Sequence, residues 1–338
     1  MNKRIAAFGE VMMRLQVPGF ELLSQASTLH YSFSGTGVNV VSALSHYGHA
    51  GYLVSALPAN PLGDAAVSYL GKLGISKDYL VRWGQYLGQY FLENGVGPRP
   101  SRVTYSNRLE SSFNTAPESI YNFDGIAENV DVVHFCGITL AMNETARTNI
   151  RRFAAAVKDR GGLVVFDCNY RPSLWGEDGY KKAKPYYEEL LAMADIVMMN
   201  EKDALHVLNM QTNQTDRTEQ LKELIPAVAE AYSIGVIAGT HRTIHEDQTH
   251  SLRGYLYKDK QFTFSNTLRF TVHDRIGAGD AFTSGIIHGE LEELSPETTV
   301  AFATTAGMLK HTTVGDTPML TDEDIFEAMT SHGGDIRR

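Results

Sequence analysis

One stretch of the chain contains a complete strand–helix–strand unit, and the fold can be predicted outward from it. Residues 131–167 read DVVHFCGITLAMNETARTNIRRFAAAVKDRGGLVVFD. The two ends, Asp131–Gly137 and Leu163–Asp167, are short and nearly continuously apolar, which is typical of strands covered on both faces. Glu144–Arg160 between them has helical periodicity, and Asn143 is a candidate N-cap. We therefore expect two parallel strands joined by a helix.

The same alternation continues along most of the chain. Further strands are expected at Arg4–Gly9, Gly51–Leu57, Asp195–Asn200 and Ile234–Gly239. Helices are expected at Gly37–Tyr47, Ala65–Leu73, Lys181–Met193 and Glu219–Tyr232, the last with Thr218 as its N-cap. Near the C-terminal end we expect hairpin strands in Gln248–Phe264 and Thr267–Val272, then helices at Gly279–Leu291, Pro296–His311 and Asp322–Met329. This pattern predicts an α/β fold with a doubly wound, mostly parallel sheet, which binds ligands at the carboxyl ends of its strands.

Two segments depart from the alternation. Leu15–Phe33 and Arg82–Phe113 are rich in Gly, Pro, Ser and aromatic residues, alternate like strands and contain no long helix. We interpret them as excursions from one large domain of residues 1–338, approximately at 11–34 and 82–115. Together they are predicted to form a small antiparallel β-sheet that covers the body as a lid.

The charge balance excludes several classes of protein. The 338 residues carry a net charge of −9. An acidic chain is a poor candidate for binding nucleic acid or an anionic membrane, because both depend on basic patches.

The sequence also lacks the features of a membrane or secreted protein. The longest apolar runs are of strand length, far short of the ~20 residues of a membrane span. The N-terminal segment reaches a charge again at Glu10, unlike a signal peptide. The two cysteines lie in buried-looking strand patterns, so we expect a reduced, cytoplasmic protein.

The sharpest motif is Asp274-Arg-Ile-Gly277-Ala278-Gly279-Asp280-Ala-Phe-Thr-Ser-Gly285. Its glycines precede an apolar helix, so bare backbone N–H groups at the positive end of the helix dipole form an anion hole. Asp280, just inside the helix, is placed to act as a general base toward a substrate hydroxyl, and Asp274 is a candidate substrate contact. The alternative is that the glycines make a turn and Asp280 only caps the dipole.

A second glycine motif is Gly35-Thr-Gly37-Val-Asn39 at the start of a predicted helix. A carboxamide beside free N–H groups suits the hydroxyls of a polyol. The rival interpretation, a dinucleotide fingerprint, lacks the third glycine and follows a lid strand instead of the first core strand. The chain also contains no P-loop motif.

These motifs resemble the ribokinase (PfkB-type) sugar kinases in type and order. The resemblance spans about residues 5–329 and rests on Gly9-Glu10, Gly35–Asn39, Asp167-Cys-Asn169, Asn200-Glu-Lys-Asp203 and Gly277–Asp280. It implies a ribokinase-like fold and ATP-dependent phosphorylation of a sugar hydroxyl. Asp280 would be the base, and the backbone of Gly277, Ala278 and Gly279 would stabilise the transferring phosphoryl group together with Mg²⁺. A monovalent cation is a further cofactor to test.

The lid segments narrow the substrate class. Gly88-Gln-Tyr90, Arg102-Val-Thr-Tyr105 and Asn107-Arg108 look like the lid of 2-keto-3-deoxygluconate kinases, as does Asp167-Cys-Asn-Tyr-Arg171. A sugar acid carries a carboxylate, which Arg108 can bind in a charge-assisted pair. Tyr90 and Tyr105 are expected to close over the carbon chain, and Arg171 to lie near the junction of sugar and phosphates. The alternatives are an exposed strand arginine for Arg108, and lid-core or dimer-interface packing for Tyr90.

Two positions depart from the usual family pattern. Ser106-Asn107-Arg108 stands where the pattern is Tyr-Asp-Arg, which leaves the choice of sugar acid open. Asn200-Glu-Lys-Asp203 ends in an aspartate where the pattern has glutamate. Asp203 can still organise Mg²⁺ through water, with Glu201 as a rival for that role. The alternative is that this segment only caps the helix that follows.

The nucleotide side is assigned from the resemblance alone. It implies ATP contacts from the following residues: Asn169, Arg171, Asn200, Gly239, Thr240, Arg242, Gly277, Gly279, Ala306 and Lys310. A polar surface loop is the alternative for Thr240–Asp247. The histidines His134, His206 and His288 are interpreted as structural.

The leading hypothesis is therefore a 2-keto-3-deoxygluconate kinase. The alternatives are a fructokinase- or ribokinase-type kinase of a neutral sugar, and a catalytically silent sugar-binding protein of the same fold. An aromatic lid would expose an apolar sheet face, which favours a homo-oligomer, either a dimer formed through the lid or a higher assembly.

Overall fold

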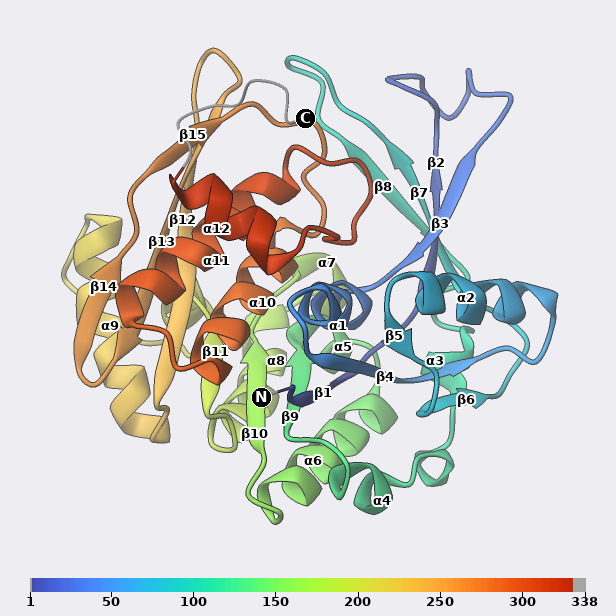
Figure 1. Ribbon diagram of the computed structural model, residues 1–338, viewed down its shortest axis with the longest axis horizontal. Helices are drawn as coiled ribbons and strands as arrows, with labels where there is room; N and C mark the ends of the chain where they lie inside the picture. Colours follow the sequence, from blue (N-terminus) through green and yellow to red (C-terminus); the bar gives the residue numbers. More distant parts are fainter. Residues whose placement is uncertain (1, 331–338) are drawn as a thin grey trace.

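The computed structural model describes residues 2–330, and the central sheet of this part has 11 strands (Figure 1). They are β1 Arg4–Phe8, β4 Ala50–Leu57, β5 Ile75–Ser76, β6 Leu80–Arg82, β9 Val132–Cys136, β10 Leu163–Asp167, β11 Ile196–Met198, β12 Val236–Ile244, β13 His250–Lys258, β14 Gln261–Phe264 and β15 Leu268–Phe270. Their order is β14-β13-β12-β11-β10-β9-β1-β4-β5, with β15 beside β13 and β6 beside β4. The α/β fold is confirmed.

The central strands are parallel, as their continuous apolar runs predict. In the described chain β1, β4, β5, β6, β9, β10, β11 and β12 pair only in parallel with one another, whereas β13 is antiparallel to β12, β14 and β15. The predicted strand at Leu163–Asp167 agrees with β10 at both ends. The two short strands β5 and β6 were not predicted, because runs of two and three residues carry no readable periodicity.

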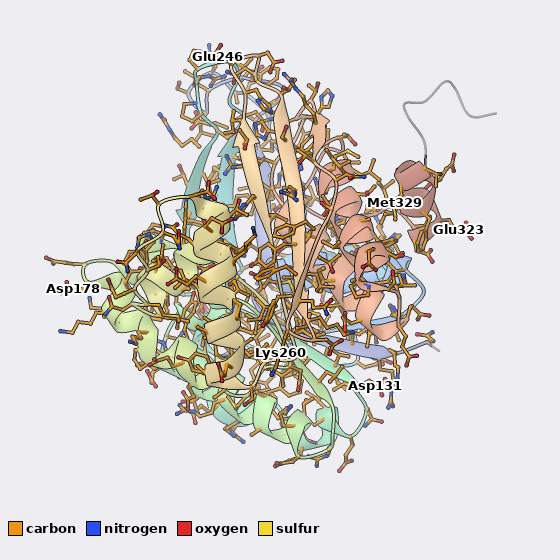
Figure 2. All side chains as sticks on the ribbon, turned by 90° about the vertical axis from the view of Figure 1, so that its left-hand side faces the viewer. Asp131, Asp178, Glu246, Lys260, Glu323 and Met329 are labelled. Carbon is orange, nitrogen blue, oxygen red and sulfur yellow. The ribbon has the colours of Figure 1, made fainter. Side chains whose placement is uncertain are left out.

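Helices cover both faces of this sheet. The longer ones are α1 Thr36–His46, α2 Pro61–Lys72, α6 Glu144–Lys158, α8 Gly179–Leu191, α9 Arg217–Tyr232, α10 Ala278–Leu291, α11 Pro296–Lys310 and α12 Asp322–Thr330. The shorter ones are α3 Ser112–Thr115, α4 Phe123–Ala127, α5 Gly137–Leu140, α7 Pro172–Trp175, the 3-10 turn η1 Glu118–Ile120 and the π-helical turn η2 Asp203–Val207. Figure 2 shows α9 lying across one face of the strands and α10–α12 on the opposite side. Each face has its own buried apolar core.

Local chemistry sets where the helices begin. The side chain of Asn143 accepts the N–H of Ala146 at 2.8 Å, which confirms it as the N-cap of α6. The prediction of Thr218 as the N-cap of α9 is wrong. Asp216 caps that helix, because its carboxylate accepts the N–H groups of both Thr218 and Glu219. An aspartate also suits the positive end of the dipole.

The two excursions contribute a separate four-stranded sheet, which we call the lid. Its strands are β2 Met12–Gln16, β3 His30–Ser34, β7 Gly88–Glu93 and β8 Arg102–Ser106, in the order β3-β2-β7-β8. The expectation of a fully antiparallel lid is corrected at its centre, since β2 and β7 pair in parallel. Each excursion is a hairpin that leaves the body on its first strand, and the two first strands lie side by side. Only the pairs within each hairpin are antiparallel.

Candidate active site

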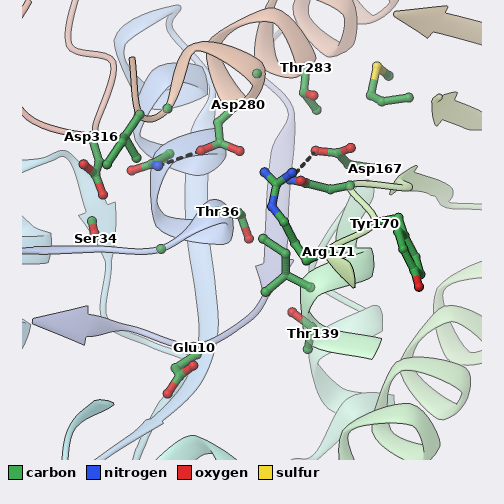
Figure 3. Close-up of a pocket in the computed structure, with 18 of the residues that line it drawn as sticks. Glu10, Ser34, Thr36, Thr139, Asp167, Tyr170, Arg171, Asp280, Thr283 and Asp316 are labelled. Atoms are coloured by element: carbon green, nitrogen blue, oxygen red, sulfur yellow. Dashed lines mark hydrogen bonds between the residues drawn. The ribbon is translucent and has the colours of Figure 1, made fainter. Parts of the chain in front are cut away.

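A pocket of about 760 Å³ lies between the lid and the carboxyl ends of the body strands. It brings together many of the residues that the sequence predicted, from both halves of the chain. Those that line it are Gly35, Asn39, Tyr90, Tyr105, Arg108, Asn169, Arg171, Asn200, Asp203, Gly239, Thr240, Gly277, Gly279 and Asp280. In the close-up, Ser34 and Asp316 lie to one side of Asp280, and Asp167 and Tyr170 lie to the other (Figure 3).

The glycine turn before α10 opens the helix N-terminus toward this pocket. Gly277 has φ 83°, and a Cβ there would overlap the carbonyl oxygen of Asp316, so the position requires glycine. A Cβ on Gly279 would meet no atom within 4 Å. The space in front of the first helical turn is therefore open. The first N–H groups of a helix have no partner inside it, so they can bind an anion there.

Asp280 is held at this opening by Asn39. The Asn39 side-chain N–H donates to a carboxylate oxygen of Asp280 at 2.6 Å, and the Thr317 hydroxyl donates to the amide oxygen of Asn39 at 3.1 Å, which fixes the orientation of the amide. Burial raises the pKa of Asp280 to about 7, and the charge of Asp316 adds to the rise. The hydrogen bond from Asn39 and the charges of Arg171 and Lys310 oppose it. A carboxylate with this pKa can take a proton near neutral pH.

The lid end of the pocket is built around Arg108. Its Nε donates to Glu10 at 2.9 Å, and its guanidinium lies 4.8 Å from the centre of the Tyr105 ring. Glu10, which follows the first strand, is buried because Gly88 leaves room for its side chain. The Tyr90 hydroxyl donates to Asp316 and lies 3.2 Å from the hydroxyl of Ser34. Glu10 was predicted only as part of a motif, without a role, and Asp316 was not predicted as a site residue.

The opposite end of the pocket carries carboxylates and one arginine. The Arg171 side chain points into the space between Asp280 and Asp167 (Figure 3). Burial raises the pKa of Asp167 to about 7, with the charges of Asp280 and Asp203 adding to the rise. Burial likewise raises the pKa of Asp203 to about 6. Asp167 ends a buried strand, and its position at the carboxyl edge is the signal that could have identified it.

Asp203 also closes a local turn, because it accepts the backbone N–H of Asn200 at 2.8 Å. Asp203 therefore both caps this turn, as the alternative prediction had it, and lines the pocket. The prediction that Glu201 could replace Asp203 in organising Mg²⁺ does not fit its position. Its buried carboxylate is bound by Arg217 at 2.6 Å and His241 at 3.0 Å, which hold its pKa at about 2 despite its burial, and it does not line the pocket.

No set of three metal-ligating side chains is present in residues 2–330. The acids Asp167 and Asp203 nevertheless both line the pocket. Burial favours their protonated forms, and a bound cation would favour the ionised forms that can serve as ligands. This donor set fits Mg²⁺, which binds through one or two carboxylates, phosphate oxygens and retained water.

Six predicted site residues do not line the pocket: Gly37, Asp274, Ala278, Ala306, Lys310 and Arg242. Gly37 lies inside α1, where a Cβ would approach Ala7 and Leu53. Asp274 is bound by Arg14 at 2.7 Å. Ala278 is the first residue of α10, next to the lining glycines.

Ala306 and Lys310 are buried on α11, whose small residues let it pack closely against α10; a Cβ on Gly285, for example, would crowd Ala303. The Lys310 ammonium donates to the carbonyl of Thr313 at 3.2 Å. Arg242 lies on β12 and is partly buried. Arg275, whose positive charge acts on Arg242 and helps to lower its pKa, lines the pocket instead. It was not predicted as a site residue.

The remaining histidines do not assemble into a metal site within the described chain. His288 lies against His49, with ring nitrogens 3.0 Å apart, and His134 is buried in β9. None of the described helices has the length and apolar composition needed to cross a membrane.

Comparison with known proteins decides between the enzyme classes. Residues 2–323 match the family model described as pfkB family carbohydrate kinase. The chain belongs to the pfkB family of carbohydrate kinases. It is thus a member of an ATP-binding sugar kinase family, which excludes the dinucleotide interpretation of the Gly35–Asn39 motif.

Three relatives of this pfkB kinase cover nearly its whole length. A crystal structure provisionally assigned as a 2-keto-3-deoxygluconate kinase from Enterococcus faecalis is 36% identical, with a TM-score of 0.95 over 100% of this chain and 99% of that one. The 2-dehydro-3-deoxygluconokinase structure from Thermotoga maritima is 30% identical, with a TM-score of 0.93 over 98% and 99%. The 2-dehydro-3-deoxygalactonokinase of Haloferax volcanii is 27% identical over 99% of this chain and 98% of its own.

Proposed function

We propose that this pfkB kinase transfers the γ-phosphoryl group of ATP to the terminal hydroxyl of a 2-keto-3-deoxy sugar acid, with 2-keto-3-deoxygluconate as the leading substrate and its 6-phosphate as the product. The observation that carries the substrate class is Arg108 at the lid end of the pocket. The observation that carries the reaction is Asp280 at the mouth of the glycine-rich anion hole.

The transfer step needs a general base, N–H groups that stabilise negative charge, and a base held in a fixed position. Asp280 removes the proton from the sugar hydroxyl as the oxygen attacks the γ-phosphorus, and the bond to ADP breaks on the opposite side. The N–H groups at the start of α10 stabilise the charge on the transferring group. Asn39 keeps the carboxylate of Asp280 in place at 2.6 Å.

Arg171 and Asp203 are proposed to serve the nucleotide end. Arg171 is exposed to the pocket, and among the described residues its guanidinium forms no ion pair, so its charge is available for phosphate. Asp203, with Asp167 beside it, would hold Mg²⁺ through its water shell. The cation would supply positive charge that stabilises the phosphate groups of ATP.

The contact between Arg108 and Glu10 leaves part of the guanidinium free for an acidic sugar. Glu10 takes only the Nε of the guanidinium. Among the described residues, no group forms a hydrogen bond with the two terminal nitrogens of Arg108. A carboxylate can therefore bind them, and Tyr105 stacked on the guanidinium restricts its orientation. A neutral ketose would leave these two nitrogens without a charged acceptor, although Nε keeps its pair with Glu10.

The relatives include both a gluconate- and a galactonate-type kinase, and these sugar acids differ in the configuration at one hydroxyl-bearing carbon. A kinase that discriminates weakly at this carbon is the second candidate. Ser106 and Asn107 depart from the common family pattern beside Arg108, so this end of the lid is the place where such tolerance would arise.

We test the carboxylate assignment with a matched pair of lid variants. Arg108→Met should raise KM for 2-keto-3-deoxygluconate by about 100-fold, the cost of losing a charge-assisted pair, and leave KM for fructose unchanged. Arg102→Met removes a lid arginine that is 74% exposed and should change neither constant. Equal effects of Arg108→Met on acidic and neutral sugars would refute the assignment.

A dimer formed through the lid is proposed from its exposed apolar side chains. Phe20, Tyr31 and Val103 are 57%, 61% and 40% exposed, and they come from both excursions. A second copy of the chain is the occupant that we propose for this surface. Light scattering should give twice the monomer mass for the wild type, and a monomer for Tyr31→Glu combined with Val103→Glu.

A further inference from the structure

The lid contains one fully buried arginine, Arg14 on β2, whose side chain is only 1% exposed. Its guanidinium bonds three acceptors: Asp274 at 2.7 Å, Gln16 at 2.6 Å and Asp316. Gln16 belongs to the same strand, whereas the two carboxylates come from loops of the body. Arg14 therefore joins the lid to the body through two buried ion pairs, one with each loop. Such a cluster is stable only while every charge keeps its partner.

Both acidic partners are themselves fixed to the backbone around the anion hole. One oxygen of Asp274 accepts the N–H of Ile276 at 3.2 Å, and the other accepts the N–H of Gly315 at 3.1 Å. The carbonyl of Asp316 lies against Gly277, as the overlap with a Cβ there shows. The residues that Arg14 holds are thus in direct contact with the turn that presents the α10 amides.

The neighbouring lid strand reaches the same place. Tyr90 is the register partner of Arg14 across the parallel β2–β7 pair, and its hydroxyl also donates to Asp316. Met12, Tyr90 and Leu92 form a small apolar cluster against Ile276, the residue before Gly277. The inner face of the lid consequently packs on the glycine turn itself, with Arg14 as its only buried cation among the described lid strands.

We propose that Arg14 is a positioning residue that couples lid docking to the geometry of the anion hole. It does not touch the reacting atoms. It holds Asp274 and Asp316 so that the 274–277 turn and the lid form one unit, and Asp280 lies three residues after this turn. This inference rests on the proposed phosphoryl transfer for its effect on rate. The coupling itself is a property of the protein without substrate.

The arginine fork is required because two carboxylates are bridged at once. A lysine at this position would keep the charge but offers one ammonium in place of two parallel N–H groups. Arg14→Lys should therefore recover folding and only part of the rate, which a purely electrostatic role would not explain. Arg14→Met leaves two buried carboxylates without a partner, so Arg14→Met/Asp274→Asn, which removes one charge of each sign, is the variant to compare if the single one fails to fold.

The test measures turnover and hydrogen exchange on the same variants, with Arg102→Met as the matched lid control because the Arg102 side chain is 74% exposed. In Arg14→Met/Asp274→Asn we expect kcat to fall by about 100-fold, the scale of a misplaced catalytic group, with KM for ATP within threefold of wild type. Without any substrate, exchange should accelerate at both residues 12–16 and residues 274–281. Arg102→Met should change neither.

A kcat within threefold of wild type overturns the proposal, whatever the exchange shows. Faster exchange confined to residues 12–16 overturns it equally, because the lid would then be loosened without the turn. If the wild type phosphorylates neither 2-keto-3-deoxy sugar acids nor neutral sugars, the proposed function fails. The exchange data still decide whether Arg14 couples the lid to the 274–277 turn.

Discussion

Among single residues, Asp280 matters most for the proposed phosphoryl transfer, because its protonation decides whether it can act as a base. Asp280→Asn should fold normally and lower kcat by at least about 1,000-fold, because the amide cannot accept the proton and general-base catalysis contributes on this scale. Steady-state assays with 2-keto-3-deoxygluconate and ATP measure this loss. Turnover within tenfold of wild type would remove Asp280 from the mechanism.

The same side chain should affect stability in a pH-dependent way. Its pKa is about 7 in the folded protein and 3.8 ordinarily, so between these values the folded state holds a proton that the unfolded state has lost. Stability therefore falls as pH rises through this window. Asp280→Asn should raise Tm relative to wild type at pH 8, and the gain should disappear near pH 4. A constant difference across this range would contradict the raised pKa.

The pH dependence of the reaction should follow from the same group. kcat/KM should decrease below about pH 7 as Asp280 takes up a proton. Asp167 titrates in the same range, so the observed limb belongs to a coupled pair. Asn39→Leu removes the hydrogen bond that favours the ionised form of Asp280 and should shift the limb to higher pH. An unshifted limb would assign it to Asp167 instead.

At the scale of elements, the two glycines before α10 should behave differently. Gly277→Ala places a Cβ at φ 83° against the Asp316 carbonyl and should lower both Tm and kcat. Gly279→Ala meets no protein atom and replaces a glycine in the first helical turn, so Tm should stay the same or rise. Its methyl group enters the space proposed for phosphate, so kcat/KM for ATP should fall by about 10-fold or more. Thermal melts and kinetics on the two variants separate the roles.

Elements were predictable where one periodicity dominates. The strand at Leu163–Asp167 and the cap at Asn143 need only local chemistry, and both are confirmed. The parallel β2–β7 pair was not predictable, because it depends on how two hairpins distant in sequence meet. Thr218 was predicted as a cap because threonine is a good capping residue. Asp216, two residues earlier, is equally suitable, and the geometry shows that it caps the helix.

The site divides in the same manner. Asp280, Asn39 and Arg108 were found because motif and chemistry agree, and they line one pocket. Arg14 was missed because a charged residue in an alternating lid strand is ordinarily solvent-exposed. Its partner Asp316 lies 302 residues away, and no local pattern reports that contact. Ala306 and Lys310 do not line the pocket and are buried on α11, so their predicted contact with ATP stays a prediction.

At the scale of the whole molecule, a chain of net charge −9 is proposed to bind two anionic substrates. The structure provides for this locally, with helix amides and the pocket arginines Arg108, Arg171 and Arg275. Five acids line the same pocket, and burial raises the pKa values of four of them, namely Glu10, Asp167, Asp203 and Asp280. Selectivity should therefore come from the placement of a few cations and not from a positive field.

The wild-type kcat/KM, measured with ATP across a matched sugar panel, decides whether this protein is a sugar-acid kinase. The panel holds 2-keto-3-deoxygluconate, 2-keto-3-deoxygalactonate, fructose and ribose. We predict that at least one of the two keto acids exceeds both neutral sugars by about 100-fold or more, and that the product carries phosphate on its terminal oxygen. Fructose or ribose turned over as efficiently as either acid would contradict the assignment of Arg108 and the sugar-acid kinase with it.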